Sequence, residues 1–359
     1  MKTTLNILVL SLLVISVIPG VFATSIGTGV PIDIETEDFE PQVWMCGSRL
    51  VFDDATEPGR ISDDGQFLVE RINNYAFEGE QISWEVLVMD KNGFEKIKDV
   101  YGTVGSSQGA GNEIEVNCVF DEVAREVERD CNARILEEEL TDEDLSLVAA
   151  YYTCTLTVET ADSMYGEYWV TVEAEDNDGL LGTMDENEFW FFNPVIALSI
   201  DGDLTFEEVR PGTSAYSSTL LVGNDADDGS GVLLDMFISG TDFYDSSSSG
   251  AKCPTTNQLS LSAFSYFATN GAYSSLFDPR GAADAERYVP IAYGIGFNNP
   301  SPFYGANEIM QTPVLLGPYF AGNILAPGAE IALTFRLDLP EPCNGDFDTG
   351  SLYFWGEAI

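Results

Sequence analysis

Three short loops of the chain combine carboxylate and amide side chains in the way that proteins use to hold hard cations. Calcium takes about six to eight oxygen ligands, mostly from Asp, Asn, Glu and backbone carbonyl groups on a turn. The acidic residues of the three loops are Glu175, Asp176 and Asp178; Asp225, Asp227 and Asp228; and Asp346 and Asp348. The sequence therefore predicts calcium as a candidate cofactor at these loops.

A simpler interpretation of the same loops needs no metal. None of them has the ligand spacing and the glycine of an EF-hand loop. Each contains an Asp-Gly or Asn-Gly pair, at Asp178, Asp228 and Asn344, and such pairs favour tight turns on their own account. The alternative is therefore that the three loops only close hairpins.

The residue types of the chain exclude most of the common catalytic machinery. It contains no histidine, which rules out a Ser-His-Asp triad, a Cys-His pair and an imidazole metal site. It also has no glycine-rich phosphate loop and no basic aromatic stripe for nucleic acid. A pair of carboxylates could hydrolyse glycosides, but no pair stands out among 60 acidic residues. We expect a protein that is not an enzyme.

The charge of the chain restricts its partners. A formal net charge of -45 repels nucleic acid and anionic lipid, and it favours surroundings rich in calcium, magnesium or salt. Adaptation to salt alone would also explain this charge. The hydrophobic content of 45% argues against disorder, because it suffices for large cores.

The first residues resemble an export signal. Lys2 gives a positive start, residues 5–18 form a short apolar run, and Pro19-Gly20 breaks that run before small or apolar residues at 21–23. The alternative is an uncleaved anchor helix, for which the apolar run is short. We expect residues 1–23 to be a signal peptide and the mature chain to be extracellular, without inserting into the membrane.

Six cysteines in an exported chain predict disulfide bonds. Cys253 and Cys343 lie alone in the second half, so we expect them to pair. The four in the first half allow three pairings, between which the sequence does not choose; they are Cys46, Cys118, Cys131 and Cys154.

Alternation of apolar and polar residues predicts strands throughout the mature chain. The clearest strands are expected at residues 82–88, 94–104, 113–120, 151–159, 168–174, 189–192, 196–200, 218–222, 232–238, 330–339 and 351–355. The turn at residues 90–93 predicts that the first two form a hairpin. Short strands with frequent turns indicate an all-β fold of two β-sandwich domains, immunoglobulin-like or jelly-roll-like, at 24–194 and 195–359.

Two segments of the first domain are harder to place. Residues 121–144 are dense in charge and predict a short helix or a solvated loop inserted into the sandwich. Residues 31–45 are extended and acidic, and they could pair within their own domain or add a strand to a neighbouring copy. Pairing within the domain is the favoured interpretation, because sequential strands usually pair locally.

Two long stretches of the second domain, residues 259–277 and 288–307, contain no charged residue. Both are rich in aromatic and small residues. Such patches are typical of contacts between subunits. The alternative is that they pack inside the domain, and the sequence does not decide between the two.

Three stretches of the chain have a distinctive strand-and-turn sequence: ISWEVLVMDKNG at residues 82–93, YWVTVEAEDNDG at 168–179 and PCNGDFDTGSLYFWGEAI at 342–359. In these stretches the chain resembles a family of archaeal secreted surface-layer-like proteins with immunoglobulin-like sandwich domains. The resemblance implies a structural role at the cell surface. The second half is also distantly similar to exported subunits that build filaments by donating a strand.

These observations together predict an exported structural protein of the cell surface. Its copies would assemble with one another into a surface layer or an extracellular filament, with cations offsetting the repulsion between carboxylates. The first alternative is a secreted carbohydrate-binding or adhesion module, and the second is a secreted hydrolase.

Overall fold

The computed structural model describes residues 32–46, 49–52, 69–107, 110–129, 131, 145–184, 188–247, 250–294 and 306–359. The predicted signal peptide lies outside these residues. The chain divides into two compact units, Met1–Asp38 and Phe39–Ile359. In the first unit, residues 32–38 form no helix or strand, and Ile32 and Ile34 are both exposed. The rest of this description concerns the second unit.

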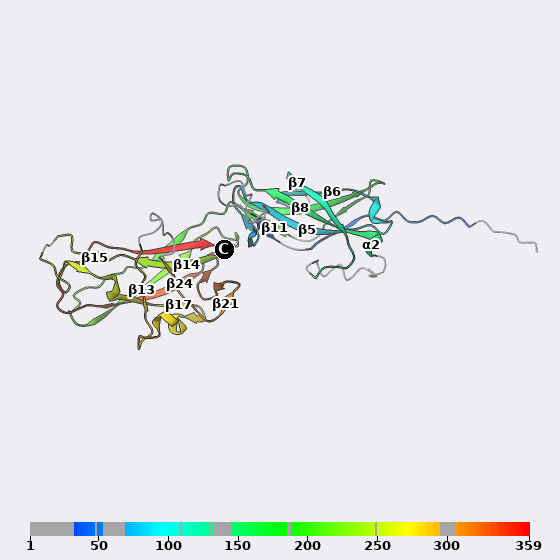
Figure 1. Cartoon of the computed structure of the whole chain (residues 1–359). Helices are drawn as coiled ribbons and strands as arrows, with labels where there is room; N and C mark the ends of the chain where they lie inside the picture. Colours follow the sequence, from blue (N-terminus) through cyan, green and yellow to red (C-terminus); the bar gives the residue numbers. More distant parts are fainter. Residues whose placement is uncertain are drawn as a thin grey trace, which may run out of the picture. The chain divides into compact units, whose positions relative to one another are not determined.

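The strands that precede Asn193 belong to one mainly antiparallel sheet (Figure 1). They are β1 (Gln42–Met45), β2 (Leu50–Phe52), β3 (Val69–Ile72), β4 (Tyr75–Ala76), β5 (Gln81–Met89), β6 (Ile97–Ser107), β7 (Ala110–Val123), β8 (Ala149–Thr157), β9 (Gly166–Asp176), β10 (Leu181–Thr183) and β11 (Glu188–Phe192). Their order is β3-β2-β5-β8-β7-β6-β9-β11-β4, with β1 on β5 and β10 on β9.

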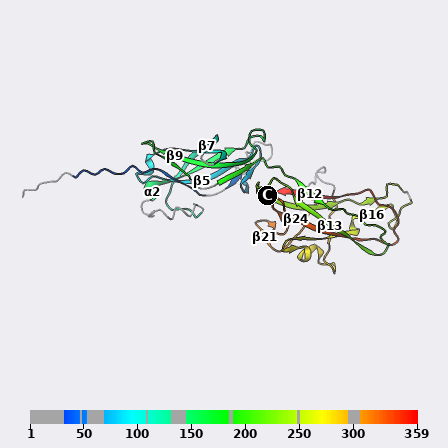
Figure 2. The same cartoon turned by 180° about the vertical axis from the view of Figure 1, so that it is seen from behind.

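This sheet curls back on itself. β1, which is hydrogen-bonded to β5, also contacts β9 and β10, although β5 and β9 are separated by three strands in the order. The inward side chains enclose one core, which includes Ile82, Trp84 and Val86 of β5 and Val170 and Val172 of β9. Figure 2 shows β5, β7 and β9 from behind. The prediction of an all-β, sandwich-like fold is confirmed for this half.

The predicted hairpin between residues 82–88 and 94–104 is wrong. Both strands form, but β5 pairs with β1, β2 and β8, whereas β6 pairs with β7 and β9. The turn between them still forms, because the buried Asp90 carboxylate accepts a hydrogen bond from the Asn92 backbone N–H. The chain then enters the short helix η1 (Phe94–Lys96) instead of returning along β5. β5 is buried on both faces, and its two edges are taken by strands from elsewhere.

The charged insertion is not helical in the part that the structure describes. Residues 121–123 complete β7, and residues 124–129 form no helix. A helix of four residues, α2 (Leu145–Val148), follows the insertion. Residues 130 and 132–144 lie outside the described residues.

The strands after Asn193 form separate sheets. They are β12 (Leu198–Asp201), β13 (Ser214–Asn224), β14 (Leu234–Gly240), β15 (Phe243–Tyr244), β16 (Gln258–Leu259), β17 (Phe264–Asn270), β18 (Tyr273–Ser274), β19 (Val289–Pro290), β20 (Asn307–Glu308), β21 (Leu315–Leu316), β22 (Tyr319–Phe320), β23 (Ile324–Leu325), β24 (Glu330–Asp338) and β25 (Leu352–Ala358). No described strand before Asn193 pairs with one of these. The domain boundary predicted at residue 194 itself stays a prediction.

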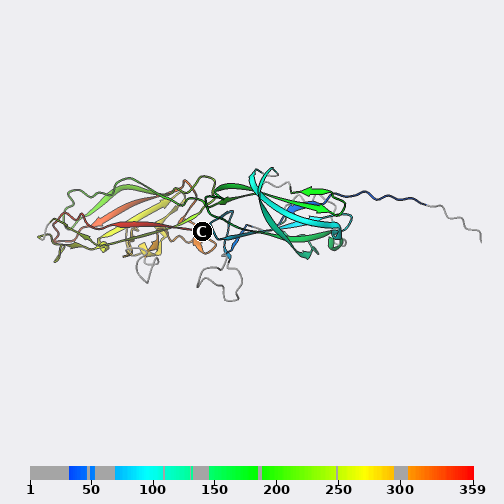
Figure 3. The ribbon, with the colours of Figure 1, turned by 90° about the horizontal axis from the view of Figure 1, so that it is seen from above.

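Two of these sheets pack face to face and enclose the core of the second half. One has the order β12-β13-β24-β17-β18, and the other places β14 between β25 on one side and β20 and β23 on the other. β24 shows the predicted alternation, because Ile331, Leu333, Phe335 and Leu337 are buried and their neighbours are not. The longer strands of this half run in similar directions when seen from above (Figure 3). This is the arrangement of a β-sandwich.

The described part of the N-terminal segment pairs within its own half where it forms a strand. β1 runs antiparallel to β5, with Gln42 opposite Met89 and Met45 opposite Val86. In the part of the chain that the structure describes, no helix is long and apolar enough to cross a membrane.

Candidate functional site

The first predicted calcium loop follows β9, and its carboxylates are held by groups of the protein. Asp176 is buried, and its Oδ1 accepts hydrogen bonds from the backbone N–H of Asp178 at 2.9 Å and of Leu180 at 2.7 Å. Asp178 forms an ion pair with Lys96, and Glu175 forms one with Lys98. These contacts use the acids to shape a turn and to bind two of the few lysines in the chain.

The second predicted loop follows β13. Asn224 is buried and fixes the loop from inside, since its Nδ2 donates to the carbonyl oxygens of Val232 and Leu325. The Asp227 carboxylate accepts hydrogen bonds from the backbone N–H of Val195 and the hydroxyl of Tyr165. Asp225 and Asp228 are exposed on the same loop.

The third predicted loop lies between β24 and β25. The Asp348 carboxylate accepts hydrogen bonds from the backbone N–H and the hydroxyl of Ser246. The backbone N–H of Asp346 donates to Asp245, and the Asp346 side chain is exposed. Among the described residues, no three Cys, Asp or Glu side chains are grouped so that they could hold a metal ion. The turn interpretation accounts for the contacts seen, and calcium binding stays a prediction.

All six cysteines form disulfide bonds. The expected pair Cys253–Cys343 is confirmed. In the first half, Cys46 pairs with Cys131, and Cys118 pairs with Cys154, which lies directly opposite it on the neighbouring strand. Disulfides persist in oxidising surroundings, so three of them fit an extracellular location.

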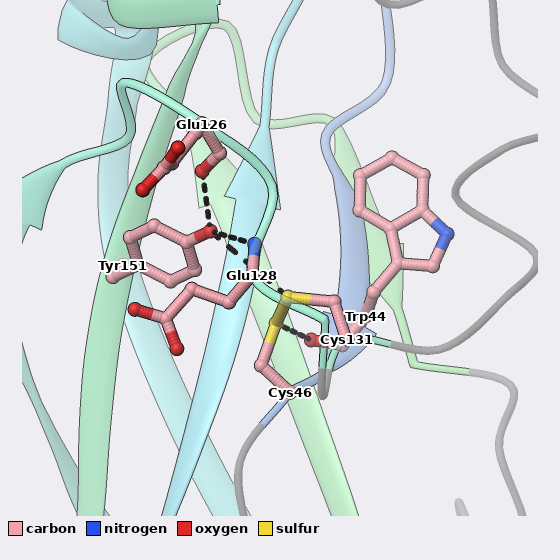
Figure 4. The surroundings of a disulfide bond; sticks show 6 residues. All are labelled: Trp44, Cys46, Glu126, Glu128, Cys131 and Tyr151. Carbon is pink, nitrogen blue, oxygen red and sulfur yellow. Dashed lines mark hydrogen bonds between the residues drawn. A yellow bond between two sulfur atoms is a disulfide. The ribbon is translucent and has the colours of Figure 1, made fainter.

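The Cys46–Cys131 bond attaches the start of the charged insertion to the sheet (Figure 4). Close to it, the buried Tyr151 hydroxyl donates to the Glu126 carbonyl oxygen at 2.8 Å and accepts from the Glu128 backbone N–H at 3.0 Å. Burial raises the pKa of Tyr151. The described start of the insertion is thus fixed against the sheet and is not a freely solvated loop.

A cavity of about 740 Å³ opens in the second half, beside the third predicted loop. Its floor is buried and apolar, with Leu259, Phe264 and Leu337. Half-buried apolar side chains form the walls, and three exposed carboxylates lie at its rim. The walls are Leu204, Phe206, Val209, Phe243, Leu339 and Phe347, and the rim residues are Glu207, Glu208 and Asp346. A concave site with an apolar floor and polar groups at its rim is a candidate binding site.

Different interactions hold the two sides of this cavity. The side around Asn344 is fixed by the Cys253–Cys343 disulfide and by two backbone hydrogen bonds between Lys252 and Asn344. On the other side, residues 204–209 pack through side chains, as Phe206 does on Phe264. Glu208 there has a φ of 49°, which is unfavourable for a residue other than glycine. The cavity is thus cross-linked to the core on one side and closed by side-chain packing on the other.

Each of the two neutral stretches is partly buried and partly exposed. Most of residues 259–277 is core, since β17 lies beside β24 and Phe264, Tyr266 and Ala268 are buried. The end of this stretch is different, because Leu276 is 45% exposed and Phe277 is 68% exposed. In the other stretch, Val289 and Ile291 are buried and Tyr293 is exposed; residues 295–305 lie outside the described residues. Sequence composition could not separate the buried part from the exposed part.

A buried carboxylate that the sequence did not single out lies in β14. Asp235 is 5% exposed, and its Oδ1 accepts a hydrogen bond from Asn323 Nδ2 at 2.6 Å. Burial, helped by the nearby carboxylates of Glu308 and Glu357 and opposed by the hydrogen bond from Asn323, raises the pKa of Asp235 to about 6.

This environment predicts a pH-dependent effect of Asp235→Asn. An unfolded aspartate has a pKa of about 3.9, so the folded state binds the extra proton between about pH 4 and 6. The stability that Asp235 contributes is full below pH 4 and is lost as the pH rises through 6. The unfolding free energy of the variant minus that of the wild type should therefore increase by about 2–3 kcal/mol as the pH rises from 4 to 7.5. Urea unfolding at several pH values measures this, with the exposed Asp203→Asn as control. A difference between Asp235→Asn and wild type that does not change with pH would contradict it.

Comparison with known proteins gives no family for this chain. No protein-family model matches it, and no curated protein matches it. Among solved structures, it is weakly similar to a chain of a chaperone–tip adhesin complex of CFA/I fimbriae, with 9% identity over 89% of this chain and 91% of that one and a TM-score of 0.23. It is also similar to the C-terminal domain of the AgI/II polypeptide BspA of Streptococcus agalactiae, with 9% identity, 89% and 97% coverage and a TM-score of 0.25. At these TM-scores, neither similarity carries an argument about function.

Proposed function

We propose that this chain is an exported structural protein of the cell surface and that its copies associate into a surface layer or an extracellular filament. The observation that carries the proposal is the set of exposed apolar side chains on the second half of a very acidic chain. These are Leu276, Phe277, Val314, Leu315 and Leu316. Exposed apolar patches on such a surface are typical of protein–protein contacts.

Further features support a structural role. Three disulfides stabilise an all-β fold against unfolding outside the cell. The absence of histidine removes the commonest catalytic groups, and we propose that the protein is not an enzyme. The resemblance to archaeal surface-layer-like proteins agrees with this role. Ile32 and Ile34, which are exposed in the N-terminal unit, could also contact a neighbouring copy.

The charge of the chain makes association dependent on cations. Copies that each carry a formal charge of -45 repel one another at low ionic strength. Salt screens this repulsion over about 8–10 Å, and divalent cations such as calcium screen it at lower concentration. Cations can therefore promote association without a dedicated binding site.

The proposal predicts that the sedimentation coefficient of residues 24–359 rises with protein concentration, and that it rises more steeply in calcium chloride or high salt than at low salt. Sedimentation velocity over a hundredfold range of concentration measures this. A variant with Phe277, Leu315 and Leu316 replaced by serine serves as a control and should associate less. A wild-type protein that stays monomeric in every condition would contradict the proposal.

A second candidate function is carbohydrate binding, favoured by one feature of β25. Tyr353 and Trp355 lie on the same side of this strand with ring planes 26° apart and centroids 6.1 Å apart. Aromatic rings with similar orientation offer apolar faces on which the C–H face of a sugar ring can pack. Binding of the monomer to a glycan array, lost in Tyr353→Ala, would favour this function over self-association.

A further inference from the structure

The second half carries both an exposed apolar turn and an apolar cavity. We propose that Leu276 and Phe277 of one copy insert into the cavity of a second copy, so that copies join head to tail. This inference rests on the proposed self-association and names the two surfaces that would carry it. It identifies the occupant of the cavity as a second copy of the same chain.

The turn that presents Phe277 is held in place by the residues on both sides of it. Ser275 is buried, and its hydroxyl accepts a hydrogen bond from the Ala268 backbone N–H of β17. Asp278 is fully buried and accepts hydrogen bonds from Arg280 and from the Gln311 backbone N–H. Phe277 lies between these two anchors and is exposed. A side chain that is already ordered loses little conformational entropy when it binds.

The cavity matches such a side chain in chemistry and in size. Its floor and walls are formed mainly by leucine and phenylalanine, and Phe243 and Phe264 place their ring centroids 4.7 Å apart. A volume of about 740 Å³ lies within the range that holds drug-sized ligands, so it has room for a leucine and a phenylalanine side chain.

The two surfaces are separated along β17, so the contact forms between copies. The cavity is lined by Phe264, the first residue of this strand. The turn follows β18, which pairs with Thr269 and Asn270 at the other end. The anchor of the turn at Ala268 lies four residues from Phe264, or about 13 Å along a strand. Because both anchors fix the turn, its own cavity is out of reach.

Arginines partly compensate the acidic charge near the turn. The rim of the cavity carries Glu207, Glu208 and Asp346, and among the described residues no basic one lines it. Near the turn, Asp278 is paired with Arg280, and Asp284, Glu286 and Asp338 share Arg336. The turn can therefore approach the acidic rim with less repulsion than a surface of unpaired carboxylates.

A contact between two different surfaces has a consequence for the assembly. Each copy that binds through its turn still presents a free cavity, and the reverse also holds. Such a heterologous contact repeats without limit unless the rotation between copies closes a ring. The expected products are filaments or rings, and not symmetric dimers.

Two variants and their mixture test the inference in the full mature chain. Phe277→Asp removes the inserting side chain, and Val209→Trp fills the cavity from the wall at residues 204–209. We expect each variant to remain monomeric at concentrations at least about tenfold above those at which the wild type assembles. Mixed together, they should form a dimer that does not grow, because one supplies the cavity and the other supplies the turn. Ile200→Asp, which adds the same charge at a similarly exposed site, should assemble like the wild type.

Native mass spectrometry and analytical ultracentrifugation count the copies, and the melting temperature of each variant shows that it is folded. A dimer found only in the mixture supports the inference. If the wild type assembles and both variants assemble equally well, the inference is overturned while the proposed function stands. The same holds if the mixture contains only monomers. If the wild type never assembles, both are overturned.

Discussion

Replacing Asp278 with alanine should lower the free energy of unfolding by about 3–5 kcal/mol, a large effect for one surface-facing turn. Asp278 is completely buried. Its Oδ1 accepts from the Arg280 backbone N–H and Nε at 2.9 Å, and its Oδ2 accepts from Arg280 Nη2 at 2.5 Å and from the Gln311 backbone N–H at 3.0 Å. Alanine would leave Arg280 charged and largely buried without its carboxylate partner.

The pKa of Asp278 agrees with a strong pair. Burial alone would raise this pKa, but the hydrogen bonds from Arg280 and Gln311 lower it below its usual range. A carboxyl group with a lowered pKa in the folded state contributes its stability above the unfolded pKa of about 3.9 and loses it in acid. The difference between wild type and Asp278→Ala should therefore be full at neutral pH and should shrink below about pH 4.

Urea unfolding followed by tryptophan fluorescence measures the effect. Asp203→Ala, at an exposed position, should change the unfolding free energy by less than about 0.5 kcal/mol. The double variant Asp278→Ala/Arg280→Met should recover part of the loss, because it removes the unpaired charge as well. A loss in Asp278→Ala no larger than that of Asp203→Ala would contradict this account of the turn.

Removing the disulfide of the second half is the other change with a large expected effect. The double variant Cys253→Ala/Cys343→Ala should lose about 2–5 kcal/mol of stability. The bond closes a loop with a sequence separation of 90 residues, for which the chain-entropy model gives about 4.6 kcal/mol. Both sulfur atoms are buried, so alanine avoids leaving hydroxyl groups without hydrogen bonds.

The loss should also have a local component at the cavity. Cys343 is part of the lining, and residues 343–347 are attached to the fold through Cys253 and Lys252. We expect faster proteolytic cleavage in this loop than in wild type, in addition to a lower urea midpoint. The variant Cys118→Ala/Cys154→Ala is the control, because it removes a bond elsewhere and should leave cleavage of residues 343–347 unchanged. Equal midpoints for the wild type and the Cys253→Ala/Cys343→Ala variant would contradict the prediction.

Strands with one buried face were the most predictable part of the fold. In β24, the alternation from Ile331 to Leu337 fixes which side faces the core, whatever the neighbouring strands are. The pairing of strands was less predictable, as β5 shows. Its turn has the residues of a hairpin, but β5 is buried on both faces and takes its neighbours from distant segments. Local turn chemistry cannot specify such long-range pairing.

The candidate site could be predicted only in part for a similar reason. The carboxylates of the first acidic loop are held by Lys96 and Lys98, which are 82 and 77 residues away from their partners in the chain. The sequence shows the acids but not the distant lysines. Likewise, Tyr266 and Phe277 belong to the same neutral stretch, yet one is fully buried and the other is exposed. Tyr266 lies in β17 opposite Phe335 of β24, whereas Phe277 lies in a short helix at Ser275–Phe277, beyond that pairing.

The measurement that tests the central claim most directly is electron microscopy of residues 24–359, purified and imaged with calcium and with a chelator. The account predicts ordered filaments or sheets in calcium, and fewer or none after chelation at low salt, because the repulsion between acidic copies is then unscreened. Monodisperse single particles in calcium, in chelator and in high salt would contradict self-association and would favour a binding module.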